Sequence, residues 1–135
     1  MTIRAIDLER EYSRLSLWWT KRGLTAPSKV IFEGADGFCA QVSGIDLAVG
    51  WIMLSRKGTV AMSEFVTSNP DMMRNAVSAQ AIEHLYSHFE AYAKEQGYTV
   101  LFTSTEAGGS ISRFLAKRGW SDCKGEPHAH MVKAI

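Results

Sequence analysis

A single acidic residue interrupts an otherwise uncharged stretch near the middle of the chain. The segment from Val60 to Val66 is mostly apolar, small or β-branched, and Glu64 is its only charge. This composition is typical of a largely buried strand. A carboxyl group that is removed from water holds its proton more tightly, which suits acid–base chemistry near neutral pH. Glu64 is therefore a candidate proton acceptor, unless its side chain faces solvent or pairs with an arginine or lysine.

The segment after this strand favours an anion at the start of a long helix. Residues 67–70 (TSNP) end the strand, because proline lacks a backbone donor and serine and asparagine are typical of turns. A helical pattern then extends to Gln96 and Gly97. Unpaired N–H groups at the start of such a helix favour a negatively charged group, typically a phosphate.

The histidines and cysteines of the chain do not indicate a further functional site. His128 and His130 would share one face of a terminal strand, but no third metal ligand is evident, so we expect no metal site. Cys39 and Cys123 are far apart, which predicts neither a zinc site nor a disulfide framework and favours a reduced, cytoplasmic protein. The sequence also lacks the G-x-S-x-G motif of serine hydrolases and the P-loop of nucleotide-binding proteins.

Hydrophobic periodicity predicts a mixed α/β sheet that would position these residues. Three strands joined by short turns are expected to be antiparallel neighbours, and the long helix then makes a β-α-β crossover to a parallel strand. The expected strands are residues 2–6, 37–44, 46–56, 59–68, 98–103 and 128–135. Helices are expected at 7–23, from shortly after Pro70 to Gln96, and at 110–118, with a loop at 104–109; residues 29–33 fit a short strand or a helical turn.

Length and charge limit the classes of partner. The 135 residues can bury one core, and no linker or repeat divides them, so we expect a single domain over residues 1–135. The net charge of +1 gives no reason to expect nucleic-acid binding. Because no segment reaches the roughly 20 apolar residues of a membrane span, we expect no membrane partner. A homodimer is left open.

The order of these elements resembles the GNAT superfamily of N-acetyltransferases, particularly its short phage-encoded members. The resemblance spans nearly the whole chain, and the segment FLAKRGW, from Phe114 to Trp120, matches the end of the family's last helix. It implies a GNAT-like, mostly antiparallel central sheet flanked by helices, acetyl-CoA as co-substrate, and a primary amine as acceptor. In that family a loop with the pattern Q/R-x-x-G-x-G/A binds the pyrophosphate of acetyl-CoA through its backbone N–H groups.

The resemblance also assigns cofactor-binding residues. Backbone N–H groups near Phe65 and Val66, where the family's fourth strand diverges from its neighbour, would meet the thioester carbonyl and the pantetheine amides. Two glycines of the pattern are replaced here by alanine and serine, so glycine's closer approach and conformational freedom are lost. Anchored on Pro70, the matching loop is Met73, Arg74, Asn75, Ala76, Val77 and Ser78.

Catalysis in the resembling family uses a base and usually an acid. The resemblance implies that Glu64 accepts the proton of the amine, often through water. The family usually has a tyrosine where this sequence has Leu115, which cannot donate a proton. A thiol with an ordinary pKa of about 8.5 leaves tolerably as a thiolate, and Ser110 or Ser112 could assist through water. Two hypotheses result: an acyl-CoA-dependent N-acetyltransferase, and a GNAT-fold binding protein that has lost catalysis.

Overall fold

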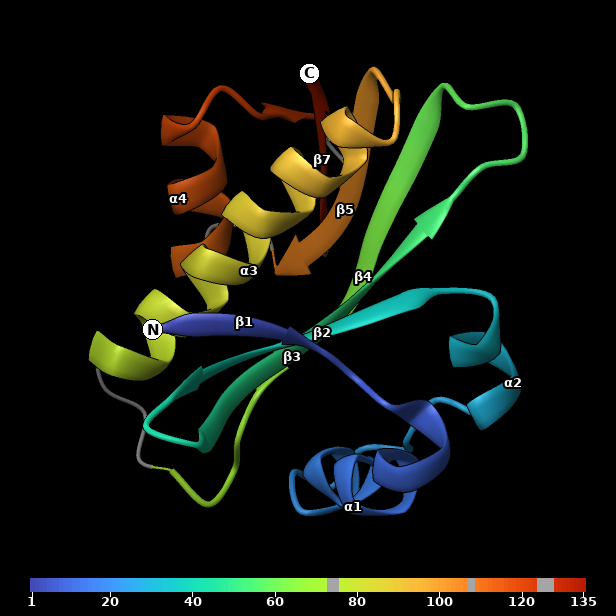
Figure 1. Ribbon diagram of the computed structural model, residues 1–135. Coiled ribbons are helices and arrows are strands. Elements are labelled where there is room, and N and C mark those ends of the chain that lie inside the picture. The colour runs from blue at the N-terminus through green and yellow to red at the C-terminus, as the bar shows by residue number, and fades with distance from the viewer. Residues whose placement is uncertain (73–75, 107–108, 124–127) are drawn as a thin grey trace.

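The computed structural model describes residues 1–72, 76–106, 109–123 and 128–135 (Figure 1). Within these residues seven strands form one sheet in the order β1-β2-β3-β4-β5-β7-β6. The strands are Thr2–Ala5 (β1), Asp36–Val42 (β2), Ile45–Leu54 (β3), Val60–Ser68 (β4), Val100–Glu106 (β5), Ser121–Asp122 (β6) and His128–Ala134 (β7). The helices are Leu8–Thr20 (α1), Lys29–Glu33 (α2), Ala76–Glu95 (α3) and Ser110–Lys117 (α4).

The sheet is mixed and mostly antiparallel, as the sequence predicts. Strands β4 and β5 are parallel, because α3 carries the chain from the end of one to the start of the other, and the remaining pairs are antiparallel. Asp7 caps the first helix, since its carboxylate accepts a hydrogen bond from the backbone N–H of Arg10 at 3.4 Å.

Several boundaries differ from the expected ones for identifiable reasons. The first helix ends at Thr20 and not at residue 23, because the chain turns there and Gly23 adopts a positive φ of 73°. Residues 29–33 form a helix. Strand β5 continues through residues 104–106, which were expected to be a loop, because β7 pairs with that segment. The short strand β6 was not predicted.

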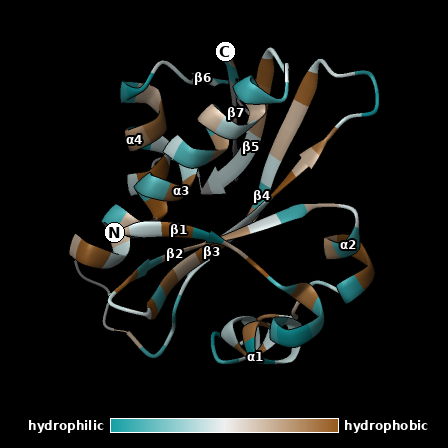
Figure 2. Ribbon diagram, viewed as in Figure 1, coloured by the Kyte–Doolittle hydropathy of each residue, from teal (hydrophilic) through white to brown (hydrophobic). Residues whose placement is uncertain are grey.

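Helices cover the sheet on both faces and enclose two hydrophobic cores. From Ala48 to Ile52, neighbouring residues of β3 that are buried belong to different cores, so the cores lie on opposite faces. Residues of α3 and α4 pack in the first core, which contains Ala48 and Ile52 of β3. Residues of α1 and α2 pack in the second core, which contains Val49 and Trp51. Figure 1 shows the two pairs of helices in separate parts of the molecule, and each helix carries both hydrophilic and hydrophobic residues in Figure 2.

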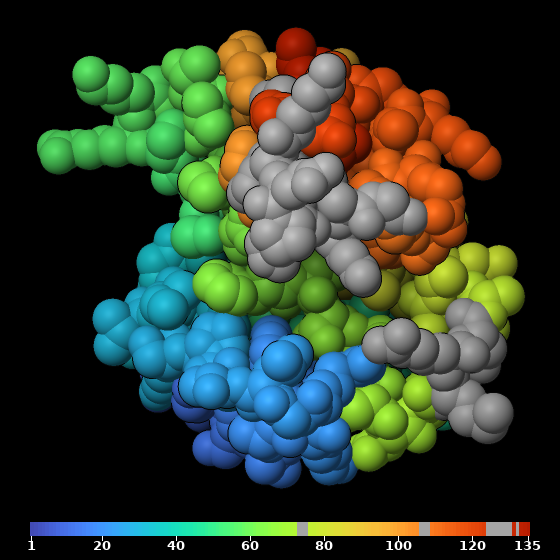
Figure 3. Space-filling view, turned by 180° about the vertical axis from the view of Figure 1, so that it is seen from behind, coloured from blue at the N-terminus to red at the C-terminus, as the bar shows by residue number. Residues whose placement is uncertain are grey.

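The second core is built from aromatic rings. Phe32 of α2 stacks on Trp51 of β3 with ring centroids 4.0 Å apart, and Trp19 of α1 packs against both. A side chain at Gly37 of β2 would collide with the indole of Trp51, so this ring lies directly against a neighbouring strand. In Figure 3 these N-terminal helices form the lower part of the molecule, in blue. The core therefore anchors the first two helices to the sheet face that also carries Glu64.

No helix in the described ranges combines the length and apolar character needed to cross a lipid bilayer.

Candidate functional site

The two parallel strands separate partway along their length. Pairing between β4 and β5 runs from Val60 opposite Val100 to Ser63 opposite Thr103, and both strands then continue apart. We call the space beyond that last pair the β4–β5 opening. It contains a cleft of about 270 Å³. The cleft is lined from β4 by Glu64, Phe65 and Val66, from β5 by Thr103, Ser104 and Thr105, from α3 by Ile82 and Tyr86, and from the start of α4 by Gly109, Ser110 and Ile111.

A β-bulge distorts β4 at the edge of this opening. Val49 of β3 faces Thr67, but Trp51 faces Glu64, so Phe65 and Val66 together oppose the single residue Gly50. Phe65 adopts a positive φ of 58°, which is uncommon for a residue other than glycine. A bulge leaves the extra residue outside the regular ladder and bends the strand. The backbone therefore leaves regular pairing at the two positions to which the sequence resemblance assigns thioester contacts.

Gly50 makes the bulge compatible with the helix packed on the sheet. A Cβ atom at this position would lie 2.9 Å from the ring of Phe89 and 2.9 Å from a methyl group of Val66. Such contacts are closer than packed carbon atoms tolerate. The absence of a side chain on β3 thus lets α3 and the bulged segment of β4 approach each other.

Glu64 lies in the cleft, half-buried, on the sheet face of α1 and α2. The hydroxyl group of Ser104 on β5 donates a hydrogen bond to its Oε1 atom at 3.3 Å. The carboxylate is thus held at the point where the two strands begin to separate. Its expected role as a base stays a prediction.

The beginning of α3 contains only part of the predicted cofactor loop. Met73, Arg74 and Asn75 lie outside the described residues. Ala76, Val77 and Ser78 form the first described turn of α3, where Val77 is 42% exposed and Ser78 is buried. One and two turns further along, Ile82 and Tyr86 reach the cleft, so the helix leads from the predicted loop to the opening.

A chain of hydroxyl groups that sequence reasoning missed closes the end of the opening. The hydroxyl of Tyr86 lies 3.2 Å from Oγ1 of Thr103, which donates a hydrogen bond to the carbonyl oxygen of Ser63 at 2.7 Å. Burial raises the pKa of Tyr86 to about 12, so this group is neutral at ordinary pH. Tyr86 follows Leu85 on the apolar side of a helix, where a tyrosine that only packs would give the same pattern. The sequence therefore carries no signal that would single it out.

Comparison with solved structures shows which fold these elements form. A ribosomal-protein-alanine N-acetyltransferase from Brucella melitensis has a TM-score of 0.72 at 14% identity, with 100% of both chains covered. An aminoglycoside 6'-acetyltransferase of type Ii has a TM-score of 0.74 at 13% identity, with 99% of this chain and 97% of that chain covered. A Mycobacterium tuberculosis protein in complex with CoA has a TM-score of 0.70 at 11% identity, covering 100% and 99%. The chain has the GNAT fold. No model of a protein family and no curated protein matches the sequence.

Position 115 in the last helix of this GNAT fold contributes no proton donor to the cleft. Leu115 is fully buried in the core beneath α4. Ser112 is also buried, and its hydroxyl donates to the carbonyl oxygen of Gly109 at 2.9 Å. Ser110 is exposed and lines the cleft. Of the two serines considered as substitutes, Ser110 is the one that reaches the site.

The C-terminal histidines belong to β7, which pairs with the end of β5. In β7, His130 is paired with Ser104 and His128 with Glu106. Within the part of the chain that the structure describes, no three histidine, cysteine, aspartate or glutamate side chains are grouped so that they could hold a metal ion.

Proposed function

We propose that the protein, as a single domain over residues 1–135, is a member of the GNAT superfamily that transfers an acetyl group from acetyl-CoA to a primary amine. The observation that carries this proposal is the cleft in the β4–β5 opening, where a bulged backbone at Phe65 and a carboxylate at Glu64 lie together. The structural neighbours support the reaction class, since their names include N-acetyltransferases and one was solved with CoA.

The proposed position of the cofactor follows the elements around the cleft. The pyrophosphate would bind at Arg74 to Ser78, because the start of a helix favours a phosphate. The pantetheine arm would extend from α3 into the opening and meet the backbone at Phe65 and Val66. The thioester would then lie within reach of Glu64, on the side of the opening where β4 and β5 separate.

The proposed reaction needs one proton acceptor and one oxyanion donor. Glu64 accepts a proton from the amine, directly or through water, so that the nitrogen can attack the thioester carbonyl. Backbone N–H groups in the bulged segment at Phe65 and Val66 donate to the developing oxyanion. Collapse of the tetrahedral intermediate releases the thiolate of CoA and leaves the acetylated amine.

A binding protein without catalysis is the second candidate. It is favoured by the complete burial of Leu115 where the resembling family usually has a tyrosine, and by Ala76 and Ser78 in place of glycines. This candidate is a binding or interaction protein that has lost the general acid and part of the CoA loop, and it does not transfer an acetyl group.

Isothermal titration with acetyl-CoA and a release assay for the free thiol distinguish these candidates. We expect binding, a higher melting temperature at saturating cofactor, and thiol release that depends on an added amine. Binding without release from a broad panel of primary amines would favour the binding protein. Absence of both heat and thermal stabilisation at millimolar cofactor would contradict the acetyltransferase and favour the binding protein.

The sequence supports further proposals about context. We infer a cytoplasmic protein of the phage-encoded type that acts on a small-molecule or protein amine, without nucleic-acid or membrane partners, and we leave a homodimer open.

A further inference from the structure

We propose that Tyr86 donates a hydrogen bond to the sulfur atom that leaves the acyl thioester, and so performs the task that the missing tyrosine of the last helix leaves open. The inference rests on the proposed function, because it concerns the leaving group of the same reaction. It assigns Tyr86 a direct contact with a reacting atom and therefore a catalytic role.

Tyr86 lies where the cleft closes. Thr103 belongs to the last residue pair before β4 and β5 separate, and the hydroxyl of Tyr86 lies 3.2 Å from its Oγ1 atom. Both residues line the cleft, although the side chain of Tyr86 is only 2% exposed. A group inserted fully into the opening would therefore meet the tyrosine hydroxyl at its inner end.

The hydrogen bonds at this end fix which atom supplies the proton. Thr103 has one hydroxyl proton, and it donates that proton to the carbonyl oxygen of Ser63 at 2.7 Å. The proton between Tyr86 and Thr103 must then belong to Tyr86. At 3.2 Å this bond is long for two hydroxyl groups, which usually lie about 2.7–2.8 Å apart. The tyrosine hydroxyl can therefore turn toward a better acceptor with only a small loss of hydrogen-bond energy.

A second hydroxyl at this position has unused hydrogen-bonding capacity. Ser63 is fully buried, and its Oγ atom has no hydrogen-bond partner in the described part of the chain. Buried polar atoms of proteins are nearly always paired, so an unpaired one is unusual. Ser63 is paired with Thr103 in the strand ladder, so this unsatisfied hydroxyl lies next to the hydrogen-bonded hydroxyl groups at the inner end of the opening.

Tyr86 and Glu64 approach the opening from opposite faces of the sheet. Ala61 and Leu101, each two residues before Ser63 and Thr103, belong to the core under α3, and Tyr86 belongs to α3 itself. Because successive residues of a strand point to opposite faces, Glu64 and Ser104 are directed to the other side. An amine that attacks from the side of Glu64 would push the sulfur toward the side of Tyr86. The two groups are placed for bond formation and bond cleavage, respectively.

The pKa values of the CoA thiol and of Tyr86 determine whether Tyr86 transfers its proton or only donates a hydrogen bond. When the carbon–sulfur bond breaks, its electron pair moves to sulfur, while the proton lost by the amine is held by Glu64. A thiol has a pKa of about 8.5, whereas that of Tyr86 is raised to about 12 by burial, so the thiolate is too weak a base to take the tyrosine proton. Tyr86 keeps its proton and stabilises the thiolate as a hydrogen-bond donor, and solvent protonates the thiolate after release.

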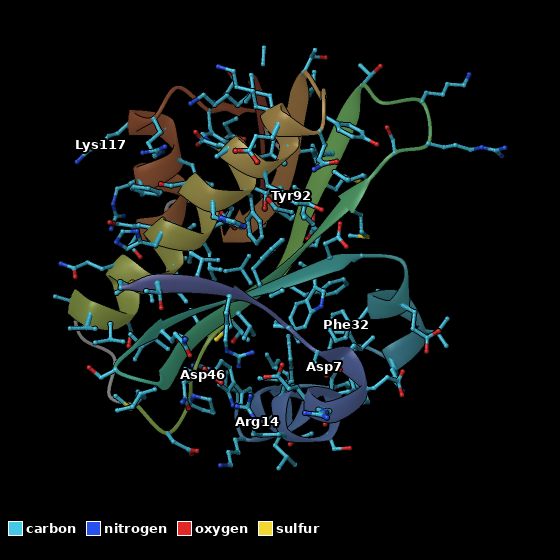
Figure 4. The ribbon with its side chains drawn as sticks, viewed as in Figure 1. Asp7, Arg14, Phe32, Asp46, Tyr92 and Lys117 are labelled. Carbon is cyan, nitrogen blue, oxygen red and sulfur yellow. The ribbon has the colours of Figure 1, made fainter. Side chains whose placement is uncertain are left out.

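The substitution Tyr86→Phe tests this contact, with Tyr92→Phe as matched control. Tyr92 lies on the same helix (Figure 4), and its hydroxyl donates a hydrogen bond to the carboxylate of Asp36 at 2.7 Å. This hydrogen bond raises the pKa of Tyr92 to about 12. A control tyrosine of similar acidity therefore reports any general effect of losing a hydroxyl from α3. Thermal unfolding of each variant shows whether it is folded.

The first measurement is the pKa of the thiol of bound CoA, followed by the ultraviolet absorbance of the thiolate. Loss of a hydrogen bond to the thiolate should raise this pKa by about one unit or more in Tyr86→Phe and leave it unchanged in Tyr92→Phe. The second is steady-state kinetics, where Tyr86→Phe should lower kcat by about tenfold or more with little change in the KM for acetyl-CoA. Thr103→Ser, which retains the hydroxyl that positions Tyr86, should keep more activity than Thr103→Val.

The outcomes separate this inference from the proposed function. A wild-type protein that binds CoA, together with an unchanged thiol pKa and kcat in a folded Tyr86→Phe variant, would overturn the role of Tyr86 and leave the proposed function standing. A wild-type protein that does not bind CoA would overturn both. A raised thiol pKa in Tyr86→Phe supports the inference even if no amine in the panel is acetylated, because the measurement needs only bound CoA.

Discussion

At the scale of residues, a substitution at Glu64 tests the chemical step separately from cofactor binding. Glu64→Gln preserves the shape of the side chain and its contact with Ser104 but removes the proton acceptor. We expect turnover to fall by about 10²–10⁴-fold, the usual contribution of acid–base catalysis, with cofactor affinity nearly unchanged. Steady-state kinetics across pH and titration with acetyl-CoA measure the two quantities. Ser104→Ala is the control, because it removes the hydrogen bond and keeps the carboxylate; equal turnover of Glu64→Gln and wild type at every pH would exclude Glu64 as the base.

The same scale shows why only part of the site could be found from the sequence. A charge within an apolar strand stands out, and the structure places Glu64 in the cleft. Tyr86 and Thr103 do not stand out, because a tyrosine on a helix and a threonine in a strand have the composition of ordinary core. Their hydrogen bond depends on the register between β4 and β5 and on the height of α3 above them, which periodicity does not determine.

At the scale of elements, the bulge in β4 depends on a missing side chain in β3. In Gly50→Ala the new methyl group would meet Phe89 and Val66 at 2.9 Å, and we expect a loss of about 1–3 kcal/mol of stability from overpacking. We also expect weaker binding of acetyl-CoA, because Val66 belongs to the bulged segment. Urea unfolding and titration of the cofactor measure these effects.

Gly34→Ala is a suitable control for this substitution. Gly34 has a negative φ of −90°, and a Cβ there would have its nearest neighbour at an ordinary 3.8 Å. Equal stability of the two variants would contradict the packing explanation for Gly50.

The type of each long element could be predicted, whereas several ends could not. Regular apolar spacing over many residues identifies α1 and α3, but residues 29–33 are too few to distinguish a strand from a helix. The polar end of β5 reads as a loop by composition and becomes a strand because β7 pairs with it. Element ends thus depend on partners that are distant in the sequence.

At the scale of the whole molecule, four charged side chains join the first strand, the first helix and the sheet. Arg4 of β1 contacts Glu11 of α1 at 2.6 Å and Asp46 of β3 at 2.8 Å. Arg14 contacts the same two carboxylates at 2.8 and 2.9 Å, near the labels of Arg14 and Asp46 in Figure 4. Because each arginine bridges both carboxylates, the cluster links β1, α1 and β3.

This cluster should make stability depend on acid pH. Hydrogen bonds from Arg4 lower the pKa of Glu11 below its ordinary value of 4.5, so between the two values the unfolded chain binds more protons than the folded one. The stabilisation is complete above pH 4.5 and is lost as pH falls through the lower, folded value. Glu11→Gln should be less stable than wild type near neutral pH and lose less on acidification, as measured by urea unfolding at several pH values.

The control for this prediction is Glu9→Gln in the same helix, where the side chain is 76% exposed and pairs with Lys29. Exposed pairs contribute little, so this variant should follow the wild-type curve. A Glu9→Gln curve that matched the one for Glu11→Gln would contradict a specific role for the cluster.

The brief pairing of β4 with β5 has a consequence for how the molecule folds. Only Val60 to Ser63 pair with Val100 to Thr103, and the chain between them contains the whole of α3. The antiparallel strands β1 to β4 are neighbours in sequence, apart from the two helices after β1, so their ladders close shorter loops. We expect the N-terminal strands to form early and the parallel joint late, and amide hydrogens of the joint to exchange before those of β2 and β3. The opening that admits a ligand would then lie beside the least cooperative part of the sheet, where widening it costs the least free energy.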